Sequence, residues 1–359
     1  MAQKFLRSKK IVLFIAVGLA AFLLYLFYYV GTGDFLQVIQ DANIYFYASA
    51  FFAFLAASFF SAVTWLSLLK SLKVQTNIRR VLLLTWAGYF FDATLPEPGW
   101  SGDITKAYIL SKNTEEYVGK TVASVVSQKI ISMAVTILIL ILGFGLLAIN
   151  FALPQQVIIF FGAIMSVSVA SFLVVYFMST NYKATRSVLN RLLIPVFSFI
   201  LRGRFNEMQF RANAEKFLTM FHKGIDSLSS ERRALLRPLG FYLLSVVFDV
   251  SIVFFVFASL GYPIPVDRVL IVYALTGTLA SVGVSFVGLT EIIMSTAYQV
   301  LMVPLAVSFS VTFLTRVVTL WFKLVIGYVT FQFAGVGILL GKGNRNSQPV
   351  ELTERSLLS

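Results

Sequence analysis

Long apolar runs follow one another along the chain, and they limit its fold more than any other feature. A helix needs about 20 apolar residues to cross the roughly 30 Å hydrocarbon core of a bilayer. A membrane β-barrel would instead show short segments of alternating hydrophobicity. The sequence therefore predicts an all-α polytopic membrane protein with about six transmembrane helices. The expected spans are 11–30, as an uncleaved first helix, 44–69, 122–149, 157–178, 239–260 and 307–340, of which the last must tilt or run past the membrane surface.

Two further apolar stretches, 81–110 and 269–303, are each interrupted near their centres. Irregular backbone at membrane depth is tolerated only where protein packs around it or where it lines a watery cavity. We therefore expect each stretch to form a re-entrant hairpin, with Ser101 and Thr290 capping the returning helices. For 81–110 the alternative is an amphipathic surface segment with an ordinary turn. The expected turn residues are Pro96, Pro98, Gly99 and Gly102 in the first hairpin, and Gly283, Ser285 and Gly288 in the second.

Lys and Arg in the loops set the expected orientation, because cytoplasmic loops carry an excess of positive charge. The stretch 179–237 is strongly basic, whereas 31–43 and 150–156 contain no Lys or Arg. This pattern requires both hairpins to return to the side they enter, so both termini are expected in the cytoplasm. Apolar residues at helical spacing in 179–237 predict helices on an anionic leaflet, or the stretch simply marks the cytoplasmic side. We expect a single membrane domain, 1–359, comprising a first hairpin plus helix (81–149), a basic cytoplasmic amphipathic loop (179–237), a second hairpin plus helix (269–340) and a flexible cytoplasmic tail (341–359).

The two interrupted stretches superpose when the sequence is shifted against itself by 188 residues, which places Asp103 on Glu291. Lys129 and Arg316 match one residue out of register. Three expected crossings separate the units, so the second unit would be inverted relative to the first. Inverted repeats with broken helices are the layout of many transporters, whose sites lie between the repeats.

Ionisable residues inside membrane helices are costly and mark functional sites by default. A cationic pair near the midplane suits a phosphate head group, and Arg is the better bidentate partner. The alternative for Asp249 is internal pairing with Arg316 or Lys129. For Lys106 and Lys323 the alternative is that the side chain reaches the cytoplasmic surface. The candidate substrate-binding residues are Asp103, Lys106, Lys129, Asp249, Glu291 and Arg316.

Several kinds of chemistry find no support in the sequence. The chain has no cysteine, which excludes disulfides and thiol catalysis, and its one histidine, His222, lies in the basic stretch. No D-x-D cluster is present, so we expect no metal, no cofactor and no catalytic residue. Nucleic acid is a poor explanation for the net charge of +13, because the positive residues lie where membrane topology places them.

Three motifs resemble the lysylphosphatidylglycerol synthase transmembrane, or flippase-like, family. "GDITKAYILSK" resembles its G-E-[apolar]₂-R-A-Y-L-L motif, "VGLTEIIMSTAYQVL" its P-G-G-[apolar]-G-x-x-E segment, and "FLTRVVTLWFKLVIGYV" its closing L-x-R-[apolar]₂-T helix. By this resemblance, the acidic residues of the family motifs correspond to Asp103 and Glu291. The basic residues correspond to Lys106, Lys129 and Arg316. Two features depart from the family pattern. Its proline and paired glycines are replaced at residues 284–286, and a frequent acid is replaced by Ser132.

The resemblance implies a lipid flippase or transporter in the cell membrane that moves a phosphate-bearing lipid between leaflets. The lipid would be an aminoacyl-phospholipid, a phospholipid or a polyprenyl-phosphate-linked molecule. A soluble aminoacyl-transfer domain is missing, so we expect no lipid synthesis and a transporter rather than an enzyme. The alternative is a membrane enzyme or accessory subunit acting on lipid-linked sugars. Expected partners are lipids with anionic or zwitterionic head groups, with a homodimer left open.

Overall fold

In the computed structural model, the described residues are 40–94, 100–111, 115–150, 155–195, 207–230, 232–281 and 288–332, and the regular elements among them are helical. Five helical stretches in this part of the chain are long and apolar enough to cross a membrane: Ile44–Ser71, Val118–Ile149, Ile158–Thr180, Leu235–Ser259 and Leu305–Thr330. They confirm the polytopic architecture and five of the six predicted spans. The other predicted span, 11–30, lies outside the described residues, as does the tail 341–359.

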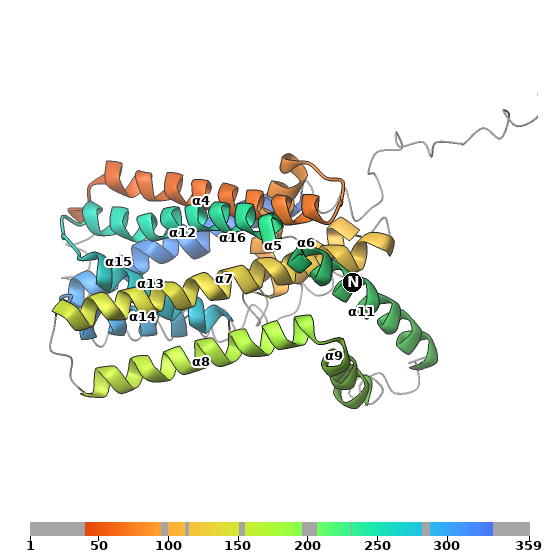
Figure 1. The fold of residues 1–359 in the computed structure, drawn as a ribbon. Coiled ribbons are helices and arrows are strands. Elements are labelled where there is room, and N and C mark those ends of the chain that lie inside the picture. The colour runs from red at the N-terminus through yellow and green to blue at the C-terminus, as the bar shows by residue number, and fades with distance from the viewer. Residues whose placement is uncertain are drawn as a thin grey trace, which may run out of the picture.

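The long helices run side by side in one bundle (Figure 1). Helix α4 (Ile44–Ser71) packs along α12 (Arg232–Ser259), where the hydroxyl of Ser245 donates a hydrogen bond to the carbonyl of Ala57. Helix α7 (Glu115–Asn150) crosses the bundle, and α8 (Gln155–Thr180) lies at its edge. The last span is continuous, and we call it the closing helix. It consists of α15 (Leu305–Arg316), a π-helical segment η2 (Val317–Phe322) and α16 (Lys323–Thr330).

Hydroxyl groups inside these apolar helices are satisfied locally. Thr64, Thr85 and Thr312 each donate a hydrogen bond to the carbonyl four residues earlier, at 2.7–2.9 Å. A polar side chain that bonds to its own helix needs no partner from the bilayer, where unpaired polar groups are costly. Small polar residues therefore occur throughout the membrane helices without marking a site.

Both interrupted stretches fold as two short helices, as the sequence predicts. The first forms α5 (Ile78–Thr94) and α6 (Ser101–Ser111), and the second forms α13 (Val266–Ser281) and α14 (Leu289–Val300). At a rise of about 1.5 Å per residue, α6 and α14 are roughly 17 and 18 Å long, too short for a hydrocarbon core of about 30 Å. The expected turn residues Pro96, Pro98, Gly99, Gly283 and Ser285 lie outside the described residues, as do the substituted positions 284–286.

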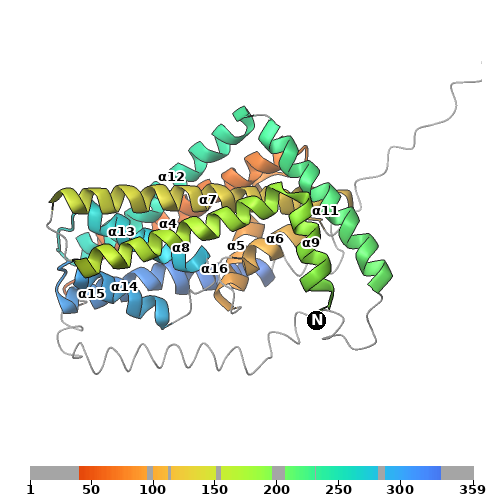
Figure 2. The ribbon, with the colours of Figure 1, turned by 60° about the horizontal axis from the view of Figure 1, so that its bottom comes forward.

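The two helix pairs begin and end at opposite ends of the bundle (Figures 1 and 2). At one end, Trp65 of α4 donates from Nε1 to the hydroxyl of Ser124 of α7 at 2.9 Å, so the end of α4 lies beside the start of α7. Helices α5 and α6 lie between these two points in the chain and share that end. At the other end, Asn43 N donates to the carbonyl of Ser259, and the rings of Phe257 and Tyr298 are 5.3 Å apart. Helix α14 therefore returns to the end where α13 starts.

Two glycines, Gly102 of α6 and Gly327 of α16, allow these helices to approach α5 closely. A Cβ atom added to Gly102 would collide with the carbonyl oxygen of Gly88 and would lie 2.7 Å from Cγ of Asp92. A Cβ on Gly327 of the closing helix would likewise lie 2.6 Å from the backbone nitrogen of Phe90. The backbone of α5 is therefore in direct contact with that of α6 and with that of α16.

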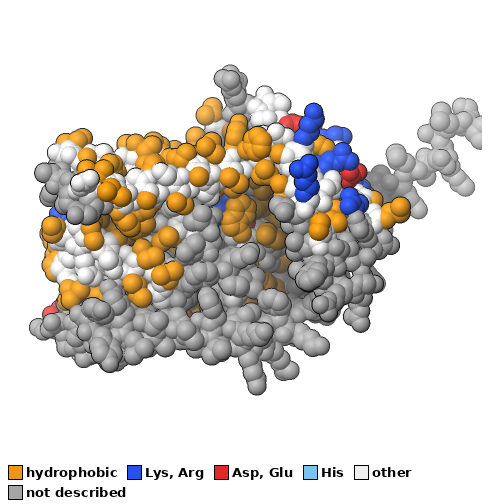
Figure 3. Space-filling view, turned by 90° about the horizontal axis from the view of Figure 1, so that it is seen from below, with side chains coloured by type: hydrophobic (Ala, Val, Ile, Leu, Met, Phe, Trp, Pro, Cys, Tyr) orange, Lys and Arg blue, Asp and Glu red, His pale blue; other side chains and the backbone are white. Residues whose placement is uncertain are grey.

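Lys and Arg side chains gather at one end of the molecule (Figure 3). This end contains α9 (Tyr182–Val188), the π-helical segment η1 (Leu189–Leu193) and α11 (Glu207–Ser230). Helix α11 buries Leu218, Phe221, Ile225 and Leu228, whereas Lys183, Arg186, Arg191, Arg211, Lys216 and Lys223 of this region are exposed. The described parts of 179–237 are therefore largely helical, and α11 is amphipathic as its spacing predicts.

His222 belongs to the packed face of α11 instead of a loop. Its Nδ1 lies 2.9 Å from the carbonyl oxygen of Leu218, and its ring meets that of Tyr182 edge-on at 5.2 Å. The side chain is only 6% exposed. His222 therefore helps to fix α11 against the bundle.

Candidate functional site

A cavity of about 230 Å³, which we call the polar cavity, lies inside the bundle next to the first helix pair. Helices α4, α5, α6, α7, α12 and α16 all contribute to it. Three of the six predicted site residues, Asp103, Lys106 and Lys129, line it. Its lining residues are Ser61, Thr85, Gly88, Tyr89, Asp92, Gly102, Asp103, Lys106, Gln128, Lys129, Ser132, Tyr242 and Lys323.

A second hollow of about 170 Å³ continues from the polar cavity toward Asp249, and we call it the Asp249 cavity. The two share Ser61, Tyr89, Tyr242 and Lys323, so Lys323 faces both. The Asp249 cavity is further lined by Phe54, Ala57, Ser58, Ser245, Asp249 and Thr319. Together the two hollows form one polar interior between membrane helices.

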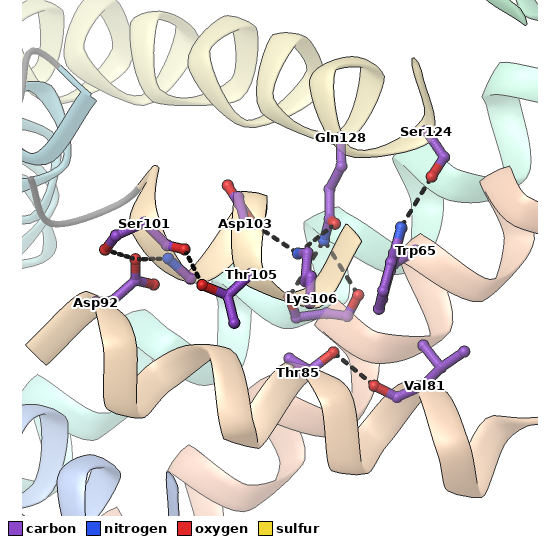
Figure 4. Close-up of polar contacts among 12 residues, drawn as sticks. Trp65, Val81, Thr85, Asp92, Ser101, Asp103, Thr105, Lys106, Ser124 and Gln128 are labelled. Carbon is purple, nitrogen blue, oxygen red and sulfur yellow. Dashed lines mark hydrogen bonds and ion pairs between the residues drawn. The ribbon is translucent and has the colours of Figure 1, made fainter. Parts of the chain in front are cut away.

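The start of α6 is held by a carboxylate from α5 (Figure 4). One oxygen of Asp92 accepts hydrogen bonds from the backbone nitrogen of Gly102 at 2.8 Å and from the hydroxyl of Ser101 at 3.2 Å. Ser101 was expected to cap α6, but the capping carboxylate belongs to Asp92. A sequence pattern could not show this, because the cap comes from the preceding helix and not from the residues flanking the turn.

Lys106 is buried and paired (Figure 4). Its Nζ lies 2.6 Å from an oxygen of Asp103 and donates to the side-chain oxygen of Gln128 at 3.2 Å, and its side chain is 7% exposed. It also lies 4.8 Å from the centre of the Trp65 ring. The alternative that Lys106 reaches the surface is therefore wrong. The ion pair with Asp103, one turn earlier on the same helix, keeps it inside.

Lys129 and Lys323 reach the polar cavity from opposite walls. Lys129 of α7 lies 5.1 Å from the centre of the Trp100 ring, and Lys323 of α16 lies 4.2 Å from that of Tyr89. A cation over an aromatic face is stabilised by the ring quadrupole. Lys323 was expected to extend to the cytoplasmic surface, but it lines both cavities. Ser132, at the position of a frequent family acid, accepts a hydrogen bond from the hydroxyl of Tyr242 at 2.7 Å.

The second helix pair carries its own buried ion pair. One oxygen of Glu291 lies 2.6 Å from Nε of Arg316, and the other accepts a hydrogen bond from the backbone nitrogen of Gly288 at 2.7 Å. The side chains of Glu291 and Arg316 are 5% and 15% exposed. Gly288, with φ of +90°, is the N-cap of α14, so Thr290 is not the cap that was expected. Only glycine adopts such a backbone at little cost.

These contacts correct the expected pairing of Asp249. Arg316 is paired with Glu291, whereas Asp249 shares its cavity with Lys323. Asp249 therefore neutralises neither Arg316 nor Lys129. It contributes negative charge to the interior reached by three lysines.

The chain was compared with known proteins. The model of the family described as "Lysylphosphatidylglycerol synthase TM region" matches residues 11–327. The chain belongs to this family. It is also 21% identical over 315 residues to the UPF0104 membrane protein MJ1595 of Methanocaldococcus jannaschii, covering 86% of this chain and 90% of the relative. The UPF0104 membrane protein PH1989 of Pyrococcus horikoshii is 22% identical over 321 residues, covering 88% and 94%. No solved structure matches the chain.

In this member of the lysylphosphatidylglycerol synthase transmembrane family, the motif acids occupy equivalent places. Asp103 is the third residue of α6 and Glu291 the third residue of α14, and each forms an ion pair within its helix unit. The cation partners differ, because Lys106 lies on the same helix as Asp103 whereas Arg316 comes from the closing helix. The predicted site residues therefore form two clusters, one at each helix pair.

Sequence reasoning missed neutral members of the site. Gln128, Tyr89 and Tyr242 line the polar cavity but carry no charge that would mark them in an apolar helix. One signal was present. Gln128, Lys129 and Ser132 are spaced so that they lie on one side of α7, just before the apolar remainder of that helix.

Proposed function

We propose that the chain moves a phosphate-bearing lipid between the two leaflets of the cell membrane. The observation that carries the proposal is the polar interior, in which Lys106, Lys129 and Lys323 meet within a bundle of membrane helices. Charged groups are kept in such a place only for a ligand, a partner or a pathway. Because three ammonium groups line the same cavity, the interior suits an anion such as a lipid phosphate.

The size of the polar cavity suits a head group alone. At about 230 Å³ it is smaller than the roughly 300–1,000 Å³ that encloses a whole drug-sized ligand. The tails therefore need apolar surface elsewhere. A separate apolar cavity of about 630 Å³ lies between α8, α13 and α14 and offers such surface. Its lining residues are Phe160, Phe161, Ile164, Leu275, Leu279, Ile292, Ile293, Thr296, Ala297, Val300 and Leu301.

We further propose that α5–α6 and α13–α14 are re-entrant hairpins of an inverted repeat, with both termini in the cytoplasm. The opposite ends at which the two pairs begin and return support this arrangement. The basic end with α9 and α11 would then face the cytoplasm, in agreement with the excess of positive charge expected there.

Single-cysteine labelling tests the topology directly, because the chain contains no cysteine. We expect Lys112→Cys and Lys223→Cys to react only with reagent that enters the cytoplasm, and Gln155→Cys to react from outside. Reaction of Lys112→Cys from outside would show that α5 and α6 together cross the membrane. It would remove the hairpin and the inverted repeat.

Lipid movement in reconstituted vesicles tests the function. Lys129→Met should slow the movement of a fluorescent anionic phospholipid by roughly 10-fold or more, since a hydrogen bond to a charged group contributes about 1.5–3 kcal/mol. The folded yield should change little. Lys216→Met, an exposed cation on α11, is the matched control and should move lipid at the wild-type rate. Equal rates for all three proteins would argue against a head-group site at Lys129.

A further inference from the structure

Asp249 differs from the other acids of the polar interior in having no fixed partner. Asp92 holds the start of α6 and Asp103 pairs with Lys106. Outside the polar interior, Glu291 pairs with Arg316. Within the described part of the chain, no hydrogen bond or ion pair joins Asp249 to another residue. The carboxylate is partly buried and opens into its cavity.

Lys323 is the charged side chain that lines the Asp249 cavity together with Asp249. Helix α16 contributes Lys323 to the Asp249 cavity, α5 contributes Tyr89, and α12 itself contributes Tyr242. Helix α4 and the segment η2 contribute neutral side chains, among them the hydroxyls of Ser58, Ser61 and Thr319. Lys323 is therefore the single cation that balances Asp249 in this cavity among the described residues.

Lys323 also faces the polar cavity, where the proposed function places a lipid phosphate. A carboxylate in a low-dielectric interior is stable only with a counter-charge or with a bound proton. A phosphate that draws Lys323 toward the polar cavity removes the counter-charge of Asp249. The carboxylate then binds a proton, and departure of the phosphate returns Lys323 and releases the proton.

We propose that Asp249 is a proton-binding site coupled through Lys323 to the lipid phosphate, so that the lipid anion and a proton are carried together. This inference rests on the proposed function and adds its energy source. A proton gradient in the direction of lipid movement would then drive that movement. One proton and one singly charged phosphodiester together carry no net charge.

Proton uptake on lipid binding tests the coupling. The purified full chain, in weakly buffered detergent near neutral pH, is mixed with short-chain phosphatidylglycerol, whose phosphodiester stays ionised, and a pH indicator is followed. We expect the wild type to take up protons as it binds. Asp249→Asn should bind the lipid without uptake, and Asp226→Asn, an exposed acid on α11, should behave as the wild type.

Lys323→Met provides a second variant that leaves Asp249 in place. Without its counter-charge Asp249 is already protonated, so this variant should bind the lipid more weakly, through Lys106 and Lys129, and without proton uptake. Binding by the wild type without uptake, or uptake that persists in the Asp249 and Lys323 variants, would overturn the coupling and leave the proposed function standing. Absence of phosphatidylglycerol binding by the wild type would overturn both.

Discussion

Replacing Arg316 by alanine should lower the free energy of unfolding by about 3–5 kcal/mol, because it leaves Glu291 charged and buried without its cation. Glu291 is 5% exposed and also fixes the start of α14, so its displacement would loosen the second helix pair. Unfolding in mixtures of mild detergent and SDS measures the change. This expectation is sharper than one drawn from the sequence, where Arg316 appeared as a cation free to serve a ligand.

The matched control is Arg186→Ala, which removes an exposed ion pair with Glu215 at the basic end. Surface pairs contribute at most about 1 kcal/mol, so this variant should unfold almost as the wild type does. The double variant Glu291→Gln, Arg316→Gln removes both charges and should recover part of the lost stability. If Arg316→Ala were as stable as the control, Glu291 would not depend on Arg316 in the folded protein.

Gly102→Ala should be the most damaging change at the first helix pair. The added methyl group would occupy the space of the Gly88 carbonyl oxygen and of the Asp92 carboxylate, so α5 and α6 would have to separate. Overpacking costs typically 1–3 kcal/mol, and a collision with backbone belongs at the upper end, at about 3 kcal/mol. Because Asp92 would also lose the backbone nitrogen of residue 102, we expect both stability and lipid movement to fall.

Gly145→Ala on α7 is the appropriate comparison, because a Cβ at that position meets nothing within 4 Å. Alanine is favoured over glycine inside a helix by about 0.5–1 kcal/mol, so this variant should be as stable as the wild type or slightly more stable. Similar stability of the two glycine variants would show that α5 and α6 do not approach as closely as described.

Much of the fold follows from the sequence, since the length of each apolar run and the positions of proline and glycine determine where helices start and stop. Helices α5 and α13 end at Thr94 and Ser281, directly before the residues with proline and glycine that interrupt the apolar stretches. The groups that cap α6 and α14 were harder to predict from the sequence. Asp92 acts on a helix that begins after a turn, and Gly288 replaces a side-chain cap with a left-handed backbone.

The site was anticipated as a set of residues but not as a set of pairs. The structure places Glu291 in contact with Arg316, two residues that the sequence marked separately as candidates. The sequence left two positions open for Lys106 and did not count Lys323 as a site residue, because a lysine near a helix end has a stem long enough to reach water. Whether such a side chain turns inward depends on partners from other helices. For Lys106 and Lys323 these partners are Trp65, Gln128 and Tyr89.

The closing helix touches both helix pairs. Arg316 binds Glu291 of α14 at one point, and beyond the π-helical segment η2 the backbone of Gly327 lies against Trp86 and Phe90 of α5. The closing helix therefore connects the two helix pairs, which lie at opposite ends of the bundle. A tilt of the closing helix would move Arg316 relative to Glu291 and Lys323 relative to Tyr89 at the same time. A structural change at one helix pair therefore has a direct route to the other through the closing helix.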